Sequence, residues 1–196
     1  MMEGLWKGFY QPLTPELLQR HWQAICFCFA LSLPWLIFLP GWGLRLAGAL
    51  FAAGLVMLAV LDGYYGLLYD RLLLPLGAVG LGLEALQVLP CGVEEALAAA
   101  ASAGAFFLLL RFLSRGGMGL GDVKFAAVLG LWLGVQGIMT AVFLAVLAGG
   151  VAALLLLLEG RGKDSEIAFG PFLAMGAYVS YLWGSSLWQL YWGLLL

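Results

Sequence analysis

Long apolar stretches separated by short polar connections run through almost the whole chain. Six of them approach the roughly 20 residues that an α-helix needs to cross about 30 Å of hydrocarbon. A seventh, residues 123–136, is short for a span and directly follows an aspartate, so we expect it to be tilted or to begin inside the protein. The six longer stretches are residues 23–40, 44–61, 72–89, 93–113, 138–158 and 170–192.

The composition places most of these stretches in lipid. Hydrophobic residues make up 64% of the chain and charged residues 10%, and the mean hydropathy is +1.02, which exceeds that of soluble globular proteins. The fold class expected is all-α, a polytopic integral membrane bundle of about seven transmembrane helices, with six as the alternative. Residues 1–22 carry aromatic and charged side chains and are predicted to be an interfacial segment before a membrane-embedded domain, residues 23–196. They do not resemble a cleavable signal peptide.

The basic residues predict the orientation. With a cytoplasmic N-terminus and seven spans, Arg45 alone among the lysines and arginines falls outside, and the C-terminus is periplasmic. The same arrangement of spans places Asp62, Asp70 and Asp122 together at the cytoplasmic face. The residues that fall inside are Lys7, Arg20, Arg71, Arg111, Arg115, Lys124, Arg161 and Lys163.

Several classes of function lack support in the sequence. The only histidine is His21, which excludes a cluster of histidine ligands. Cys26 and Cys28 lie within the first stretch and Cys91 at the predicted outer edge, so they form neither a CxxC pair nor a metal-ligand set, and neither a metal nor another cofactor is expected. The net charge of −2 offers no basic surface for nucleic acid. Neither a Gly-x-Ser-x-Gly nor a His-Glu-x-x-His motif is present.

Two aspartates flank the connection after the second stretch, in the run LDGYYGLLYD. Asp62 and Asp70 are eight positions apart, but Gly63 and Gly66 make one continuous helix doubtful, so their relative geometry stays open. A carboxylate beside hydrocarbon costs about 2.5 to 3.5 kcal/mol at a helix centre, and such residues persist mainly where they pair, bind ions or do chemistry. The alternative is that both aspartates only mark the ends of spans and lie in solvent.

A third aspartate follows a glycine-rich run. Residues 116–122, GGMGLGD, have too little side-chain bulk for a stable helix, so they are predicted to form a tight connection that another backbone can approach. Asp122 would point into the same space. Capping of the following helix is the alternative role for this aspartate, and the two roles are compatible.

The run that contains Asp62 and the glycine-rich run that ends in Asp122 together indicate an aspartic protease. Two carboxylates that converge in a low-dielectric site cannot both ionise easily, so one holds a proton near neutral pH. The ionised group can then take a proton from an attacking water while the other protonates the peptide carbonyl. Paired membrane carboxylates also serve ion pathways, so an ion-coupled transporter is the competing class.

These residues resemble the prepilin peptidases, or type IV leader peptidases, a group of GxGD-type membrane aspartic proteases of the bacterial inner membrane. Three elements carry the resemblance: LDGYYGLLYD, GMGLGDVKF and the Phe-Gly-Pro sequence in residues 167–176. The resemblance implies that Asp62 and Asp122 are the catalytic pair. It also implies that six further residues support the site: Asp70, Gly119, Gly121, Lys124, Gly170 and Pro171.

The resemblance implies that the substrates are type IV prepilins or type II secretion pseudopilins, cut between a short basic leader and a hydrophobic mature helix. Lys124 matches a basic residue whose charge would help to keep Asp122 ionised. Two features depart from the family: Tyr69 stands where a proline usually precedes Asp70, and the cytoplasmic domain with two CxxC pairs is not found. Methyl transfer and S-adenosylmethionine binding are therefore not carried over, and a catalytically inactive pilin-binding factor is a further alternative.

Overall fold

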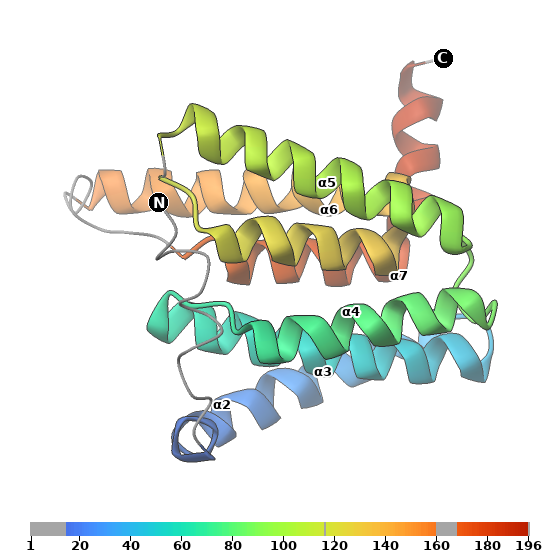
Figure 1. Cartoon of the computed structure of the whole chain (residues 1–196), viewed down its shortest axis with the longest axis horizontal. Coiled ribbons are helices and arrows are strands. Elements are labelled where there is room, and N and C mark those ends of the chain that lie inside the picture. Colours follow the sequence, from blue (N-terminus) through green and yellow to red (C-terminus); the bar gives the residue numbers. More distant parts are fainter. Residues whose placement is uncertain (1–14, 116, 160–167, 196) are drawn as a thin grey trace.

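The computed structural model describes residues 15–115, 117–159 and 168–195, and every element within them is a helix (Figure 1). The predicted all-α class is confirmed. Residues 1–14 of the expected interfacial segment lie outside the described residues, and residues 15–22 are the first turns of a helix. The elements are α2 (Pro15–Ser32), the 3₁₀ helix η1 (Leu33–Phe38), α3 (Trp42–Tyr65), α4 (Asp70–Ala85), α5 (Val93–Leu113), α6 (Leu120–Leu158) and α7 (Gly170–Leu195).

The outer surface of the bundle is covered by large apolar side chains, as expected for a protein surrounded by lipid. Phe27, Trp42 and Leu86 are among many that are exposed, whereas soluble proteins rarely expose apolar patches larger than a few hundred Å². Within the described residues, four helical segments are long and apolar enough to cross a membrane: His21–Phe38, Trp42–Tyr65, Val93–Leu113 and Leu120–Leu158.

Helix α6 is broken at one glycine. Its 39 residues would span about 58 Å if straight, nearly twice the hydrocarbon thickness. Gly134 has φ 65° and ψ −176°, a backbone conformation that is essentially restricted to glycine. The chain reverses there, so that residues 120–133 and 135–158 form two arms running in opposite directions (Figure 1). These arms correspond to the predicted stretches 123–136 and 138–158, and a bundle of seven spans remains the prediction for the membrane.

Gly134→Ala is expected to lower the thermal unfolding midpoint in detergent. Alanine at this φ and ψ is strained by about 1–3 kcal/mol, and its Cβ would lie 2.5 Å from Sγ of Cys91. Gly82→Ala is the matched control, because a Cβ there meets no atom within 4 Å. Equal midpoints for the two variants would show that the break at Gly134 is not required.

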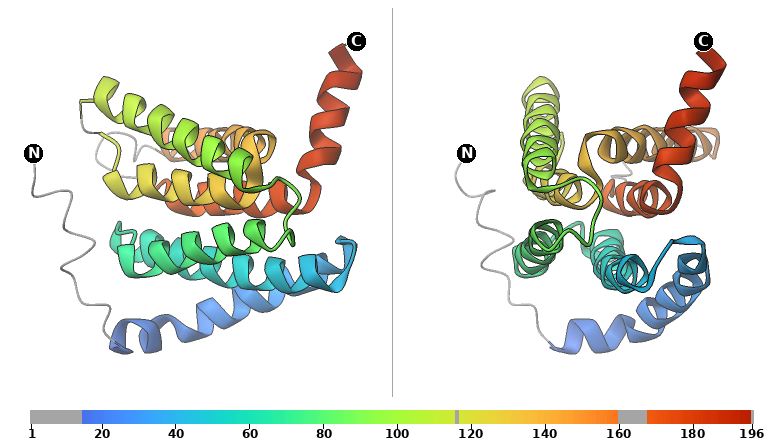
Figure 2. Two further views of the ribbon diagram at one scale, coloured as in Figure 1. Left: turned by 45° about the vertical axis from the view of Figure 1, so that its right-hand side comes forward. Right: turned by 90° about the vertical axis from the view of Figure 1, so that its right-hand side faces the viewer.

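Successive helices run in alternating directions, which gathers the aspartates at one end. The last turn of α3, the start of α4 and the start of both α6 and α7 meet at the left-hand end of Figure 1, and the two views of Figure 2 agree. Asp62, Asp70 and Asp122 therefore share one end, as the orientation from the basic residues predicts. Of those basic residues, Lys7, Arg161 and Lys163 lie outside the described residues.

Small residues allow the helices to approach closely at the core. Gly80 of α4 lies against the indole of Trp132, whose Nε1 donates to the carbonyl of Leu76 at 2.9 Å. Gly130 of α6 lies against the α5 backbone around Ala100. The Trp132 ring also stacks on Phe51 of α3, with the centroids 4.7 Å apart. These contacts fix α3, α4 and α5 around the first arm of α6.

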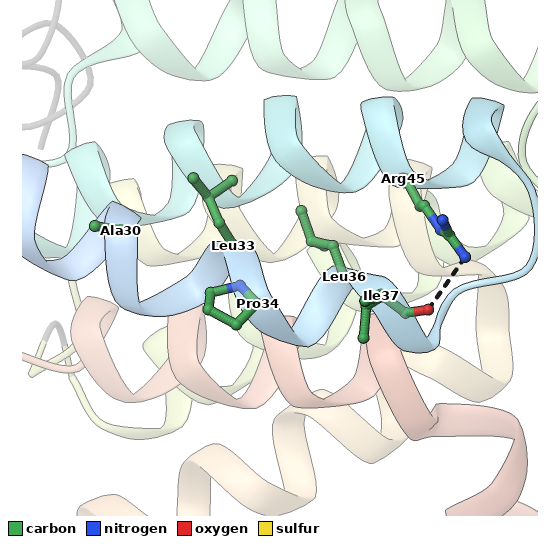
Figure 3. A pocket seen from close by; sticks show the side chains of 6 residues that line it. All are labelled: Ala30, Leu33, Pro34, Leu36, Ile37 and Arg45. Carbon is green, nitrogen blue, oxygen red and sulfur yellow. Dashed lines mark hydrogen bonds between the residues drawn. The ribbon is translucent and has the colours of Figure 1, made fainter.

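A shallow crevice of about 390 Å³ lies between α2, η1 and the start of α3 (Figure 3). Arg45 closes one end of it by donating to the carbonyls of Leu39 and Ile37, at 3.0 and 3.2 Å. Asp62 follows Arg45 by 17 positions on the same helix, a rise of about 25 Å. The crevice is therefore remote from the aspartates.

A third buried acidic side chain, besides those of Asp62 and Asp70, lies at the opposite end of the bundle. Glu84 of α4 is 1% exposed, and one of its oxygens accepts from the N–H of Gly92 at 2.8 Å. The other carboxylate oxygen has no hydrogen-bond partner. Burial, together with the carboxylates of Glu84 and Glu95, raises the pKa of the nearby Cys91 thiol to about 11, so this cysteine is a poor nucleophile at neutral pH.

Candidate active site

Asp62 lies in the last turn of α3 and is only 5% exposed. Its Oδ2 accepts a hydrogen bond from the backbone N–H of Gly170, at the start of α7, over 3.0 Å. Helix α3 ends just beyond it, where Gly66 adopts the left-handed conformation (φ 62°) and donates to the carbonyl of Asp62 at 2.7 Å. The carboxylate is thus held between two helices that are far apart in the sequence.

Asp122 is the third residue of α6, and its carboxylate accepts a hydrogen bond from the backbone N–H of Gly119, the N-cap. This is half of a capping box. The predicted connection through residues 116–122 is therefore shorter than expected, because the helix already begins at Leu120. The Asp122 carboxylate interacts electrostatically with Asp62, so the structure brings together the two aspartates that the resemblance pairs.

Three glycines lie where a side chain would disturb these carboxylates. A Cβ at Gly170 would overlap Oδ2 of Asp62, and one at Gly119 would lie 3.0 Å from Oδ2 of Asp122. A Cβ at Gly121 would approach Cβ of Leu68 to 2.9 Å, which would push the start of α6 away from the loop between α3 and α4. Close approach of backbone to carboxylate therefore requires glycine at Gly170 and Gly119, and close packing of α6 on Leu68 requires it at Gly121.

Asp70 is the first residue of α4, so it lies on a different helix from Asp62. It is buried and forms an ion pair with Lys124 of α6, with Oδ2 and Nζ 2.7 Å apart. The lysine thus pairs with Asp70, and the effect on Asp122 that the resemblance implies stays a prediction. The ion pair ties the start of α4 to the turn of α6 that carries Asp122.

Lys124→Met is expected to lower the thermal unfolding midpoint, because it leaves the buried Asp70 carboxylate without its cation. The loss is expected to be about 1–3 kcal/mol, since water can reach the partly exposed lysine position. Arg71→Gln, which removes an exposed charge at the same end, is the control. Asp70→Asn combined with Lys124→Met is expected to recover part of the loss, and a double variant no more stable than Lys124→Met would contradict this account.

Tyr69, which stands where the family usually has proline, has φ −78° and ψ 119°. This φ lies within the range of proline, so the backbone here is one that either residue can adopt. Burial raises the pKa of the Tyr69 hydroxyl above its ordinary value, and the nearby Tyr65 raises it further. Pro171 is the second residue of α7 and lies near Gly63, next to Asp62, and its supporting role stays a prediction.

Two residues near the site were not assigned a role from the sequence. Arg111, at the end of α5, donates to the carbonyl of Met118 and so fixes the loop that leads to Gly119. Phe169, which precedes Gly170, packs against Phe107 of α5 with ring centroids 6.1 Å apart. A cation shortly before a glycine-rich run was the available signal for Arg111. Among the described residues, no three side chains of His, Cys, Asp or Glu lie where they could share a metal ion.

The sequence model of the type IV leader peptidase family matches residues 49–154, more than half of the chain. The chain belongs to the type IV leader peptidase family. The matched region contains Asp62, Asp70, Asp122 and Lys124, and it ends before Gly170. The predicted resemblance is thereby confirmed, and the family together with the apolar helices indicates a bacterial membrane protein.

Curated relatives support the same family. The chain is 36% identical over 157 residues to a prepilin leader peptidase/N-methyltransferase of Aeromonas salmonicida, covering 78% of this chain and 54% of that protein. Identity to proteins of the same name is 33% in Pseudomonas aeruginosa (70% of this chain, 49% of that protein) and 32% in Bacillus subtilis (72% and 57%). The chain spans about half the length of these relatives. No solved structure matches it.

Proposed function

We propose that the chain is an aspartic endopeptidase that removes the leader peptide from type IV prepilins or type II secretion pseudopilins. The observation that carries the proposal is the convergence of Asp62 and Asp122, from separate helices, in a chain of this family. Both carboxylates also receive a backbone N–H, from Gly170 and Gly119 respectively. These bonds orient the two groups.

The chemistry requires one ionised and one protonated carboxyl. The ionised group takes a proton from water as the water oxygen attacks the peptide carbonyl carbon, and the protonated group donates to the carbonyl oxygen. The tetrahedral intermediate then collapses: the C–N bond breaks, the leaving amine receives a proton from the first carboxyl, and a hydroxyl of the intermediate returns its proton to the second carboxylate. Two closely placed aspartates suit this exchange because repulsion between like charges disfavours ionising both.

The site is assigned to the cytoplasmic face of the bacterial inner membrane, with the N-terminus cytoplasmic and the C-terminus periplasmic. The described basic residues Arg71, Arg111 and Lys124 lie at the same end as the aspartates, which supports this orientation. A substrate with an apolar helix in the bilayer would present its polar leader at that face. The relatives' names also include N-methyltransferase, and the proposal for this chain covers cleavage alone.

The test is leader cleavage of a co-expressed prepilin in a bacterial host that lacks its own leader peptidase, read as a gel mobility shift. We expect the processed form only when this chain is present, and mass spectrometry of the product fixes the bond that is cut. A prepilin that binds the protein in a pull-down but stays uncleaved would instead indicate an inactive pilin-binding factor. Absence of both, with ion-dependent flux in vesicles, would indicate the transporter.

A further inference from the structure

An apolar groove of about 430 Å³ opens on the side of the bundle, between α5 and the second arm of α6. Ser102 and Phe106 line it from α5, Met139 and Phe143 line it from α6, and Phe107 and Ile138 contribute deeper in. The Ser102 hydroxyl already donates to the carbonyl of Ala99 at 3.1 Å. The groove therefore offers shape and apolar surface and little hydrogen bonding.

The rim of the groove is unpartnered. Phe106 is 49% exposed, Met139 55% and Phe143 63%, so no described part of the chain covers these side chains fully. In the end-on view of Figure 2, α5 and the second arm of α6 stand apart on the same side of the bundle. The groove thus faces the lipid, where an apolar transmembrane helix can reach it sideways without crossing water.

A chain of contacts connects the groove with the proposed catalytic pair. Phe107, which lines the groove, packs against the ring of Phe169. Phe169 also lies beside the second arm of α6, since a Cβ at Gly149 would be 3.8 Å from its ring. The next residue, Gly170, donates its N–H to Asp62. Phe169 therefore lies between Phe107, which lines the groove, and the residue that contacts Asp62.

The depth of the groove fits a substrate helix that begins at the aspartates. Helix α5 ends at Leu113 at the aspartate end of the bundle. Phe107 and Ser102 precede that residue by 6 and 11 positions, which places them about 9 and 17 Å further in at 1.5 Å per residue. A helix leading away from the scissile bond would bring its residues about 5 to 12 past the cut into contact with the groove.

We propose that this groove docks the apolar mature helix of the substrate, and that Phe169 is a positioning residue that directs the peptide before the helix to Asp62 and Asp122. The inference rests on the proposed endopeptidase function and extends it to the part of the substrate that is not cut. A lipid acyl chain also suits an apolar groove, but the path to the aspartates and the matching depth favour a helix. Lipid alone is one outcome of the test.

Disulfide cross-linking tests where the substrate lies. In a background with Cys26, Cys28 and Cys91 replaced by alanine, and with Asp122→Asn to keep the substrate intact, single cysteines are placed at Ser102 or Met139. Each is paired with cysteines scanned along the mature helix of a prepilin. Cross-links are expected at both groove positions, centred about 5 to 12 residues after the cut. Ala101→Cys, exposed on α5 but outside the groove, is the matched control.

Cleavage kinetics in proteoliposomes test whether the groove is used. Ser102→Phe fills it and is expected to raise KM by about tenfold with kcat little changed, whereas Ala101→Phe stays near the parent. Phe169→Ala is expected to lower kcat more than it raises KM, because the leader is still bound but is poorly placed. A purely structural role for Phe169 would instead lower the unfolding midpoint and leave kcat per folded enzyme unchanged.

The two hypotheses fail in different ways. If the parent chain cleaves no prepilin, the proposed function fails, while docking is still judged by the cross-links. If the parent cleaves but cross-links form equally at Ala101, or at neither groove position, the docking site is wrong and the groove holds lipid alone. Ser102→Phe with unchanged KM leads to the same conclusion.

Discussion

Asp62→Asn and Asp122→Asn are each expected to lower the rate of leader cleavage by about 10³-fold, since positioned general acids and bases contribute about 10²–10⁴-fold. Asparagine keeps the size of the side chain and can still receive the backbone N–H from Gly170 or Gly119. It can neither take a proton from water nor donate one as an acid. Because both aspartates act in the same step, the double variant is expected to be little slower than either single one.

Initial rates are measured with purified enzyme in proteoliposomes, after the amount of inserted protein has been equalised. Glu94→Gln makes the same carboxyl-to-amide change at an exposed position at the start of α5, the end remote from the aspartates. Its cleavage rate is expected to match that of the parent. If either aspartate variant retains cleavage within a few-fold of the parent, that residue is not half of a catalytic pair.

Most of the architecture could be predicted because the apolar pattern determines it directly. The seven stretches correspond to helical segments, with boundaries that differ by several residues where the chain turns. The break at Gly134 was harder to predict, because a glycine inside an apolar run also suits close helix packing, as it does at Gly130. The 3₁₀ segment η1 around Pro34 likewise interrupts a stretch that hydropathy alone makes continuous.

The composition of the site could be predicted better than its contacts. A carboxylate at a membrane edge is costly enough to be noticed in a single sequence, and the runs that contain Asp62 and Asp122 resemble those of the family. Which cation pairs with which carboxylate depends on the rotation and offset of separate helices. The pairing of Lys124 with Asp70 is therefore visible only in three dimensions. For the same reason, sequence could not place the backbone of Gly170 against Asp62.

Gly170→Ala is expected to lower leader cleavage by about 10²-fold or more while leaving the protein inserted in the membrane. The added Cβ would overlap Oδ2 of Asp62, so the carboxylate has to rotate away or α7 has to shift. Either movement weakens the hydrogen bond from the Gly170 N–H and changes the distance between the two carboxylates. A displacement of about 1 Å at a catalytic group is enough for a loss of this size.

Gly150→Ala is the matched control, because a Cβ at that position in the second arm of α6 meets no atom within 4 Å. Its rate is expected to match the parent. Both variants are compared by cleavage rate, thermal unfolding midpoint and cross-linking of substrate to the groove. Normal cross-linking with lost cleavage in Gly170→Ala would separate substrate docking from the placement of Asp62. Cleavage at the parent rate in Gly170→Ala would mean that the contact between Gly170 and Asp62 does not set the geometry of the reaction.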